Sequence, residues 1–130
     1  MDLLNPATIV KFIKFGLVGC SGVLIDFGLT YLVKEKLRWN KYLASSLGFC
    51  FAASSNFILN RNWTFQSDDP QITAQYFKFM LIAAVGVSLS NAILWVLSER
   101  FKIKFYTAKA LATLIVMVWN FLANSFITFQ

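Results

Sequence analysis

Four apolar stretches, each long enough to cross a lipid bilayer, dominate this sequence. They are residues Phe15 to Val33, Tyr42 to Leu59, Phe79 to Ser98 and Phe105 to Phe129. Because a helix rises 1.5 Å per residue, about 20 apolar residues cross a hydrocarbon core about 30 Å thick. Little sequence lies outside these stretches, so we predict an all-α membrane protein with four transmembrane helices in one domain, residues 1–130.

The composition supports this fold class and argues against others. Of the 130 residues, 58% are hydrophobic and 14% are charged, whereas soluble domains carry about 25% charged residues. The net charge is +6, and the basic residues lie in short loops, which favours anionic lipid headgroups over nucleic acid as partners. The chain has no histidine and no Cys-x-x-Cys spacing, so we expect no metal site and no cofactor. Cys20 and Cys50 lie inside apolar stretches, and we predict that both are buried packing residues.

A motif of the form N-F-x-x-N-x-x-x-T-F-Q closes the second and the fourth apolar stretch. Its two copies start at Asn56 and Asn120, and further matches keep the same gapless offset of 64 residues. We interpret this as a duplicated helical hairpin, with repeat 1 at about residues 12–66 and repeat 2 at about residues 76–130. Two spans per repeat make both copies enter the membrane in the same direction. The hairpins should therefore be parallel repeats, related by an axis near the membrane normal.

The motif carries polar side chains that are costly in lipid. Each copy holds two asparagines four residues apart, and therefore on one helix face: Asn56, Asn60, Asn120 and Asn124. These amides either bond across helices and hold the bundle together or line a polar groove for a ligand. Arg61 either complements the helix dipole and the headgroups or binds a phosphate. Trp63 either packs at the interface or stacks on a sugar, whereas the second copy has Ser125 and Ile127 at these two positions.

An acidic residue, Asp26, lies inside the first apolar stretch. A charge there costs about 2.5–3.5 kcal/mol on the insertion scale. Asp26 is therefore protonated, paired with a base such as Arg61 or Lys109, or facing water, and a functional role is the default for such a residue. No Ser/His or Cys/His pair and no set of paired carboxylates suggests catalysis, so we do not expect an enzyme.

The distribution of the basic residues between the two ends of the spans bears on the orientation in the membrane. The side that holds both termini carries four of them, and the two hairpin loops carry eight. The positive-inside rule alone would place the hairpin loops in the cytoplasm.

The pattern N-F-x-x-N-R-x-W-T-F after the second span, with Val18-Gly19, Gly22 and Asp26 in the first, resembles the GtrA-like family of small four-helix membrane proteins. The similarity runs from about Val10 to Gln130. It implies a role in cell-surface polysaccharide synthesis, in which the protein translocates or helps to present a polyprenyl-phosphate-linked sugar across the cytoplasmic membrane. Related domains anchor glycosyltransferases whose catalytic domain precedes the first span, which implies cytoplasmic termini, against the lysine count.

This resemblance sets our leading hypothesis. The lipid-linked sugar would contact Arg61, Trp63 and the four motif asparagines, and the partners would be that lipid and a membrane glycosyltransferase. Because a unit of 130 residues is small to enclose such a path, we also expect a homo-oligomer. Two alternatives are a small proton-coupled exporter of drugs or other cations that uses Asp26, and a non-transporting anchor for a glycosyltransferase.

Overall fold

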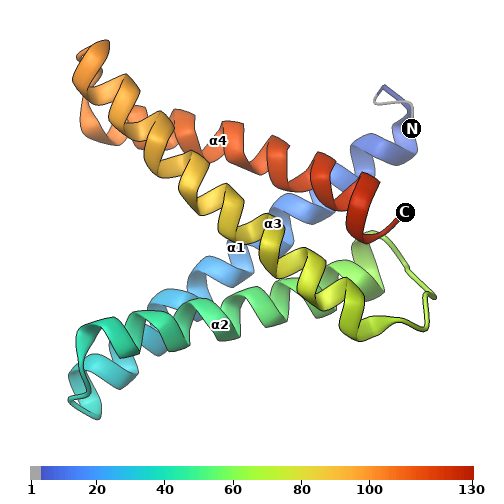
Figure 1. The fold of residues 1–130 in the computed structure, drawn as a ribbon, viewed down its shortest axis with the longest axis horizontal. Coiled ribbons are helices and arrows are strands. Elements are labelled where there is room, and N and C mark those ends of the chain that lie inside the picture. Colours follow the sequence, from blue (N-terminus) through green and yellow to red (C-terminus); the bar gives the residue numbers. More distant parts are fainter. Residues whose placement is uncertain (1–3) are drawn as a thin grey trace. The chain divides into compact units, whose positions relative to one another are not determined.

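A computed structural model describes residues 4–130, apart from the side chains of residues 41, 42 and 106. All regular secondary structure in this part of the chain is helical. The long helices are α1 (Pro6–Tyr31), α2 (Lys41–Leu59), α3 (Ile72–Trp95) and α4 (Phe105–Ala123). Each continues without a break into one π-helical turn (Figure 1), and these turns are η1 (Leu32–Lys36), η2 (Asn60–Thr64), η3 (Val96–Arg100) and η4 (Asn124–Thr128).

The structure confirms the predicted fold class. Four helices of the described residues are long and apolar enough to cross a membrane. The start of α3 differs from the predicted one, because this helix already begins at Ile72. The helix α1 begins at Pro6, the helix start that the sequence Asn5-Pro6-Ala7 predicts ahead of the first apolar stretch. This start has a helix cap in which the Asn5 side chain accepts a hydrogen bond from the Ala7 N–H at 2.8 Å.

The chain divides into two compact units, with the break between Asp69 and Pro70. In the first unit α2 returns alongside α1, and in the second α4 returns alongside α3 (Figure 1). Each unit is thus an antiparallel helical hairpin, and each predicted repeat falls within one of them. The parallel arrangement of the two hairpins stays a prediction.

Small residues bring the two helices of each hairpin close together. Every fourth residue of α2 is small and buried at Ala44, Gly48 and Ala52, and α4 has Ala108 and Ala112 at matching positions. Small residues at this spacing let helix backbones approach closely, which is a main source of packing energy in lipid.

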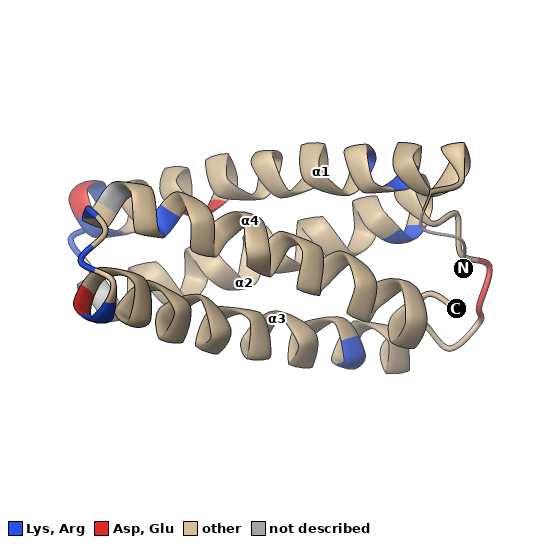
Figure 2. Ribbon diagram, turned by 90° about the horizontal axis from the view of Figure 1, so that it is seen from above, with Lys and Arg blue, Asp and Glu red and all other residues tan. Residues whose placement is uncertain are grey.

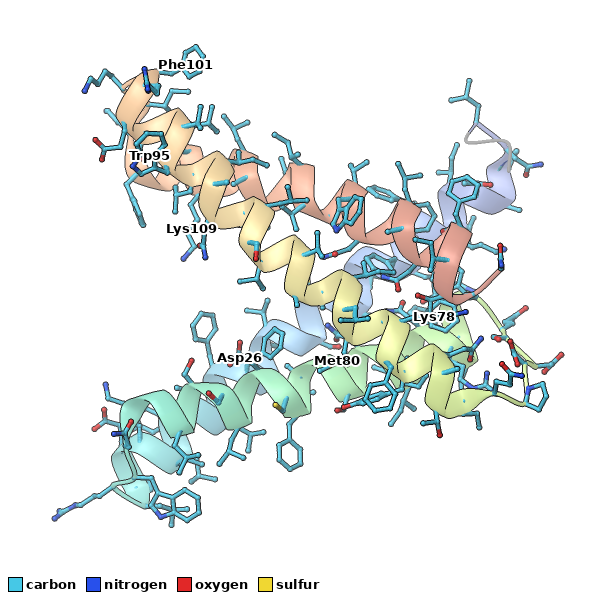
Figure 3. All side chains as sticks on the ribbon, viewed as in Figure 1. Asp26, Lys78, Met80, Trp95, Phe101 and Lys109 are labelled. Carbon is cyan, nitrogen blue, oxygen red and sulfur yellow. The ribbon has the colours of Figure 1, made fainter. Side chains whose placement is uncertain are left out.

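The distribution of side chains suits a lipid surrounding. Leu24 and Leu81 are 76% and 68% exposed, whereas Asn60 and Asn124 are 2% exposed. Large apolar side chains point outward along both hairpins (Figure 3), and charged residues gather at the turns that join the helices of each hairpin (Figure 2). Apolar surface of this kind is stable in hydrocarbon, where the backbone of each helix satisfies its own hydrogen bonds.

The cysteine prediction was wrong in one respect. Cys20 and Cys50 are free thiols, but both are exposed and not buried. The reason is geometric, because a two-helix hairpin covers only one face of each helix. An apolar stretch therefore does not mark a residue as internal, and the lipid-facing side accepts cysteine equally well.

Three of the π-helical turns are followed, two residues after their end, by a residue with a positive φ angle: Arg38 at 58°, Gln66 at 47° and Lys102 at 56°. Before Gln66, the Phe65 N–H donates to the Asn60 carbonyl at 2.8 Å, and after it the Ser67 N–H donates to the Arg61 carbonyl at 2.8 Å. This left-handed conformation costs a residue other than glycine about 1–2 kcal/mol. The glutamine that closes the first motif copy is thus the residue at which the chain turns out of the helix.

Candidate functional site

The first asparagine of each motif copy packs against a glycine of the neighbouring helix. A Cβ atom added to Gly22 would lie 2.5 Å from Asn56 Oδ1, and one added to Gly86 would lie 2.8 Å from Asn120 Oδ1. Both amide oxygens are buried without a hydrogen-bond partner among the described residues. The Cα–H groups of a glycine are at best weak donors. The two oxygens are therefore buried acceptors whose capacity is unused.

The second asparagine of each copy is bonded within its own π-helical turn. Thr64 Oγ1 donates to Asn60 Oδ1 at 2.7 Å, and Thr128 Oγ1 donates to Asn124 Oδ1 at 2.7 Å. Asn124 Nδ2 also donates to the Asn120 carbonyl at 2.8 Å. These bonds explain why the motif carries a threonine. Its hydroxyl donates to the buried amide oxygen, which would otherwise lack a hydrogen-bond partner.

The motif phenylalanines fill the hairpin contact. The first of them, Phe57 and Phe121, are each 3% exposed. The Phe65 ring meets the Phe15 ring edge to face at a centroid distance of 6.3 Å, and Phe129 meets Phe79 at 6.3 Å in the same way. The positions that the two copies share thus join the end of one helix to its neighbour. The prediction that the asparagines contact a phosphate or sugar stays a prediction.

The two hairpins differ in the residues next to these shared contacts. In the first, Lys14 Nζ lies over the Trp63 ring, 5.1 Å from its centroid, and Trp63 is 43% exposed. The matching residues of the second hairpin are Lys78, which is exposed, and Ile127, which offers no ring. At this pair of positions the first copy therefore combines a cation with an exposed aromatic face, and the second copy does not. The second hairpin has such a pair elsewhere, where Arg100 lies 5.9 Å from the centroid of the Trp95 ring.

Arg61 makes contacts that the sequence did not reveal. Its Nη1 donates to the Ser67 carbonyl at 3.1 Å, and its Nη2 donates to the Asp69 carbonyl at 2.8 Å. The guanidinium thereby holds the chain that leaves the first hairpin. Ser125, its counterpart, is buried and donates to the Phe121 carbonyl at 2.7 Å.

Asp26 lies on α1 and is half-buried (Figure 3). Thr30 Oγ1 lies 3.3 Å from Asp26 Oδ1. Within the described residues of the first unit Asp26 makes no ion pair, so pairing with Arg61, one of the alternatives, is not seen. The alternative partner, Lys109, belongs to the other unit, and that pairing stays a prediction.

The sequence did not predict the partner residues in several of these contacts. Thr30 stands four positions after Asp26, a spacing that puts both on one helix face and could have been noticed. Gly22 and Gly86 keep the 64-residue offset of the repeat, and the glycines of the first stretch predict close approach of another helix, but no local pattern shows that an asparagine packs on each of these two. The contact of Lys14 with Trp63 joins two helices, and no local pattern indicates it.

Residues 14–129 match the profile of a known family, described as GtrA/DPMS, transmembrane domain. The chain belongs to this family. The match confirms the resemblance that the motif suggested. With the four spans, it makes the chain a multi-pass membrane protein of glycan-related synthesis, associated with polyprenyl-phosphate-sugar lipid carriers. GtrA-type proteins are membrane translocases and are generally not catalytic.

Proposed function

We propose that this GtrA/DPMS chain translocates, or helps to present, a polyprenyl-phosphate-linked sugar across the cytoplasmic membrane, and that it catalyses no reaction on the sugar. The lipid headgroup meets the first hairpin at the end where α1 begins and η2 lies. The observation that carries this proposal is the pair of Lys14 and Trp63 at 5.1 Å, with Arg61 in the same turn as Trp63.

The chemistry of these three groups suits a sugar phosphate. An exposed cation–π contact is worth only about 0.5–1 kcal/mol, whereas a charge-assisted bond to a phosphate is about twice as strong as a neutral hydrogen bond. Lys14 can therefore turn from the ring to a phosphate at little cost. The uncovered Trp63 face then offers a surface on which a sugar ring stacks. Arg61, in the same turn, adds a second positive charge at this end of the hairpin while its guanidinium donates to the Ser67 and Asp69 carbonyls.

The four asparagines divide into two kinds under this proposal. Asn60 and Asn124 already use their amide oxygens on threonine hydroxyls. Asn56 and Asn120 keep unpartnered oxygens, so they are the better candidates to accept hydrogen bonds from sugar hydroxyls. Such contact requires the amides to move away from Gly22 and Gly86.

A vesicle assay tests the proposal. The purified protein is reconstituted with a fluorescent polyprenyl-phosphate-sugar, and the fraction accessible to a membrane-impermeant reagent is followed over time. We expect transport by the wild type, a rate at least tenfold lower for Arg61→Ala and for Trp63→Ile, and little change for the matched control Lys78→Ala.

Each other outcome points to a rival function. Transport that survives Arg61→Ala but is lost in Asp26→Asn favours the proton-coupled exporter. No transport by any form favours the membrane anchor. Undiminished transport by both Arg61→Ala and Trp63→Ile contradicts the proposed headgroup site.

We further infer that the termini are cytoplasmic and that the chain works as a homo-oligomer beside a membrane glycosyltransferase. The orientation is tested by labelling single cysteines at positions 36 and 69 from each side of the membrane. The exposed thiols must first be replaced, and Cys20→Ala and Cys50→Leu install the residues that the second hairpin carries at these positions. Light scattering of the purified protein tests the subunit number.

A further inference from the structure

A group of oxygen atoms gathers between α1 and α2 around the Asp26 side chain. Thr30 Oγ1 lies 3.3 Å from Asp26 Oδ1 and 3.5 Å from the carbonyl oxygen of Ala44. Gly48 leaves room for this group, because an added Cβ would lie 2.6 Å from Asp26 Oδ1 and would collide with Thr30 Oγ1. Three oxygens from two helices, a carboxylate, a hydroxyl and a carbonyl, therefore face the same small region.

The Thr30 hydroxyl lies farther from its acceptors than the hydroxyls of Thr64 and Thr128, which donate to the side-chain oxygen four residues earlier at 2.7 Å. Thr113 and Ser98 donate to the carbonyl four residues earlier, at 2.8 Å and 2.7 Å, which is the usual arrangement. Thr30 instead points towards the Asp26 carboxylate and across to α2, at distances longer than the 2.7–2.8 Å typical of hydroxyl donors. A single hydroxyl proton also serves only one of these two acceptors at a time.

The spacing of these oxygens fits a bound cation. Oxygens that bind one ion at about 2.3–2.6 Å, and at right angles to each other, lie about 3.3–3.7 Å apart. Both measured separations, 3.3 Å and 3.5 Å, fall in this range. The single carboxylate charge matches a monovalent ion, and Na⁺ is close in size to the ion for which those distances hold. Asp26 and Thr30 are half-buried, so their open side leaves room for further ligands of the ion.

Among the described side chains of the first hairpin, no base pairs with this carboxylate. Between Leu43 and Asn60, α2 carries no charged residue, and its one titratable side chain, Cys50, is exposed. Other charged residues between Pro6 and Asp69 lie towards the two ends of the hairpin in the sequence, and they are Lys11, Lys14, Lys34, Glu35, Lys36, Arg38, Lys41, Arg61, Asp68 and Asp69. The second hairpin lacks the group altogether, because Ser90, Leu94 and Ala112 stand at the positions of Asp26, Thr30 and Gly48.

We propose that the Asp26 carboxylate, the Thr30 hydroxyl and the Ala44 carbonyl form a binding site for a monovalent cation, Na⁺, between the helices of the first hairpin. This site goes beyond the headgroup site and does not depend on it. Because its ligands come from both α1 and α2, a bound ion ties the two helices together at a point where their backbones approach closely.

Direct binding of ²²Na⁺ to the purified full-length protein in nanodiscs tests the proposal, with choline as the balancing cation. We expect saturable binding of one ion per chain. Asp26→Asn, which keeps the shape but removes the charge, should abolish it, and Thr30→Val should weaken it about 10-fold or more, the usual effect of losing a supporting group at a metal site. The matched control in the second hairpin, Ser90→Ala, should bind as the wild type does.

Three results would overturn this inference. They are a wild type that shows no saturable Na⁺ binding, an Asp26→Asn variant that retains binding, and a wild type that takes up a proton at Asp26 but no Na⁺ in the same preparation. The assay contains no polyprenyl lipid, so its outcome is independent of whether the chain moves lipid-linked sugars.

Discussion

At the scale of single residues, the second asparagine, the first phenylalanine and the threonine of each motif copy are buried, whereas many large apolar side chains elsewhere on the helices are exposed. Asn60 and Asn124 are among the least exposed side chains of the described residues, at 2% each. A buried amide is stable only when its hydrogen bonds are made, and the threonine of the same turn supplies one. The sequence predicted that the asparagines share a helix face. It could not show which of them already have partners, since this depends on the wider π-helical geometry.

Replacing Asn60 by alanine should destabilise the protein. The change leaves the buried Thr64 hydroxyl without its acceptor, and an unsatisfied buried polar group costs about 1–3 kcal/mol. Unfolding by denaturant in mixed micelles measures the loss, and Asn124→Ala should give a similar value because it breaks the same bond. Asn62→Ala is the control, since Asn62 is exposed in the same turn. A variant as stable as the wild type would show that the bond contributes nothing.

At the scale of helices, close approach at small residues decides how each hairpin packs. Gly22 and Gly86 receive the amides of the facing helix, and Gly48 receives the Asp26 group. The sequence predicted four spans, because that depends on length and hydropathy alone. It placed the start of the third helix too late, at Phe79 instead of Ile72. The first residues of this helix, before Phe79, include polar side chains. One of them, Gln75, is buried and donates to the Thr128 carbonyl at 3.2 Å, a contact between residues far apart in the sequence.

Adding one methyl group to Gly22 should separate α1 from α2. The new Cβ would lie 2.5 Å from Asn56 Oδ1, and overpacking of this kind costs about 1–3 kcal/mol. Gly19→Ala is a matched control, since nothing lies within 4 Å of its added Cβ. Thermal unfolding in detergent should therefore show a lower midpoint for Gly22→Ala and no decrease for Gly19→Ala. Equal midpoints for the two variants would contradict the packing described for Asn56.

At the scale of the whole molecule, the two hairpins share the same contacts between their helices and differ in the residues beside these contacts. We propose that they are copies of one unit, which is supported by the recurrence of the Asn–Gly, Asn–Thr and Phe–Phe contacts at the same 64-residue offset. The first copy alone combines Arg61 and Trp63 with a lysine at the entry of its first helix. The sequence predicted this asymmetry of the site, because the two copies can be compared residue by residue. It could not predict that Lys14 covers Trp63, since that contact depends on how the two helices pack.

The central claim, that the headgroup of a polyprenyl-phosphate sugar binds at the first hairpin, is tested most directly by site-specific photocrosslinking. A photoreactive amino acid is placed at Trp63 or at Ile127, the matching exposed position of the second hairpin, in protein reconstituted with a radiolabelled lipid-linked sugar. We predict labelling from position 63 that is at least tenfold stronger than labelling from position 127. Equal labelling from both positions, or labelling from position 127 alone, would contradict the account.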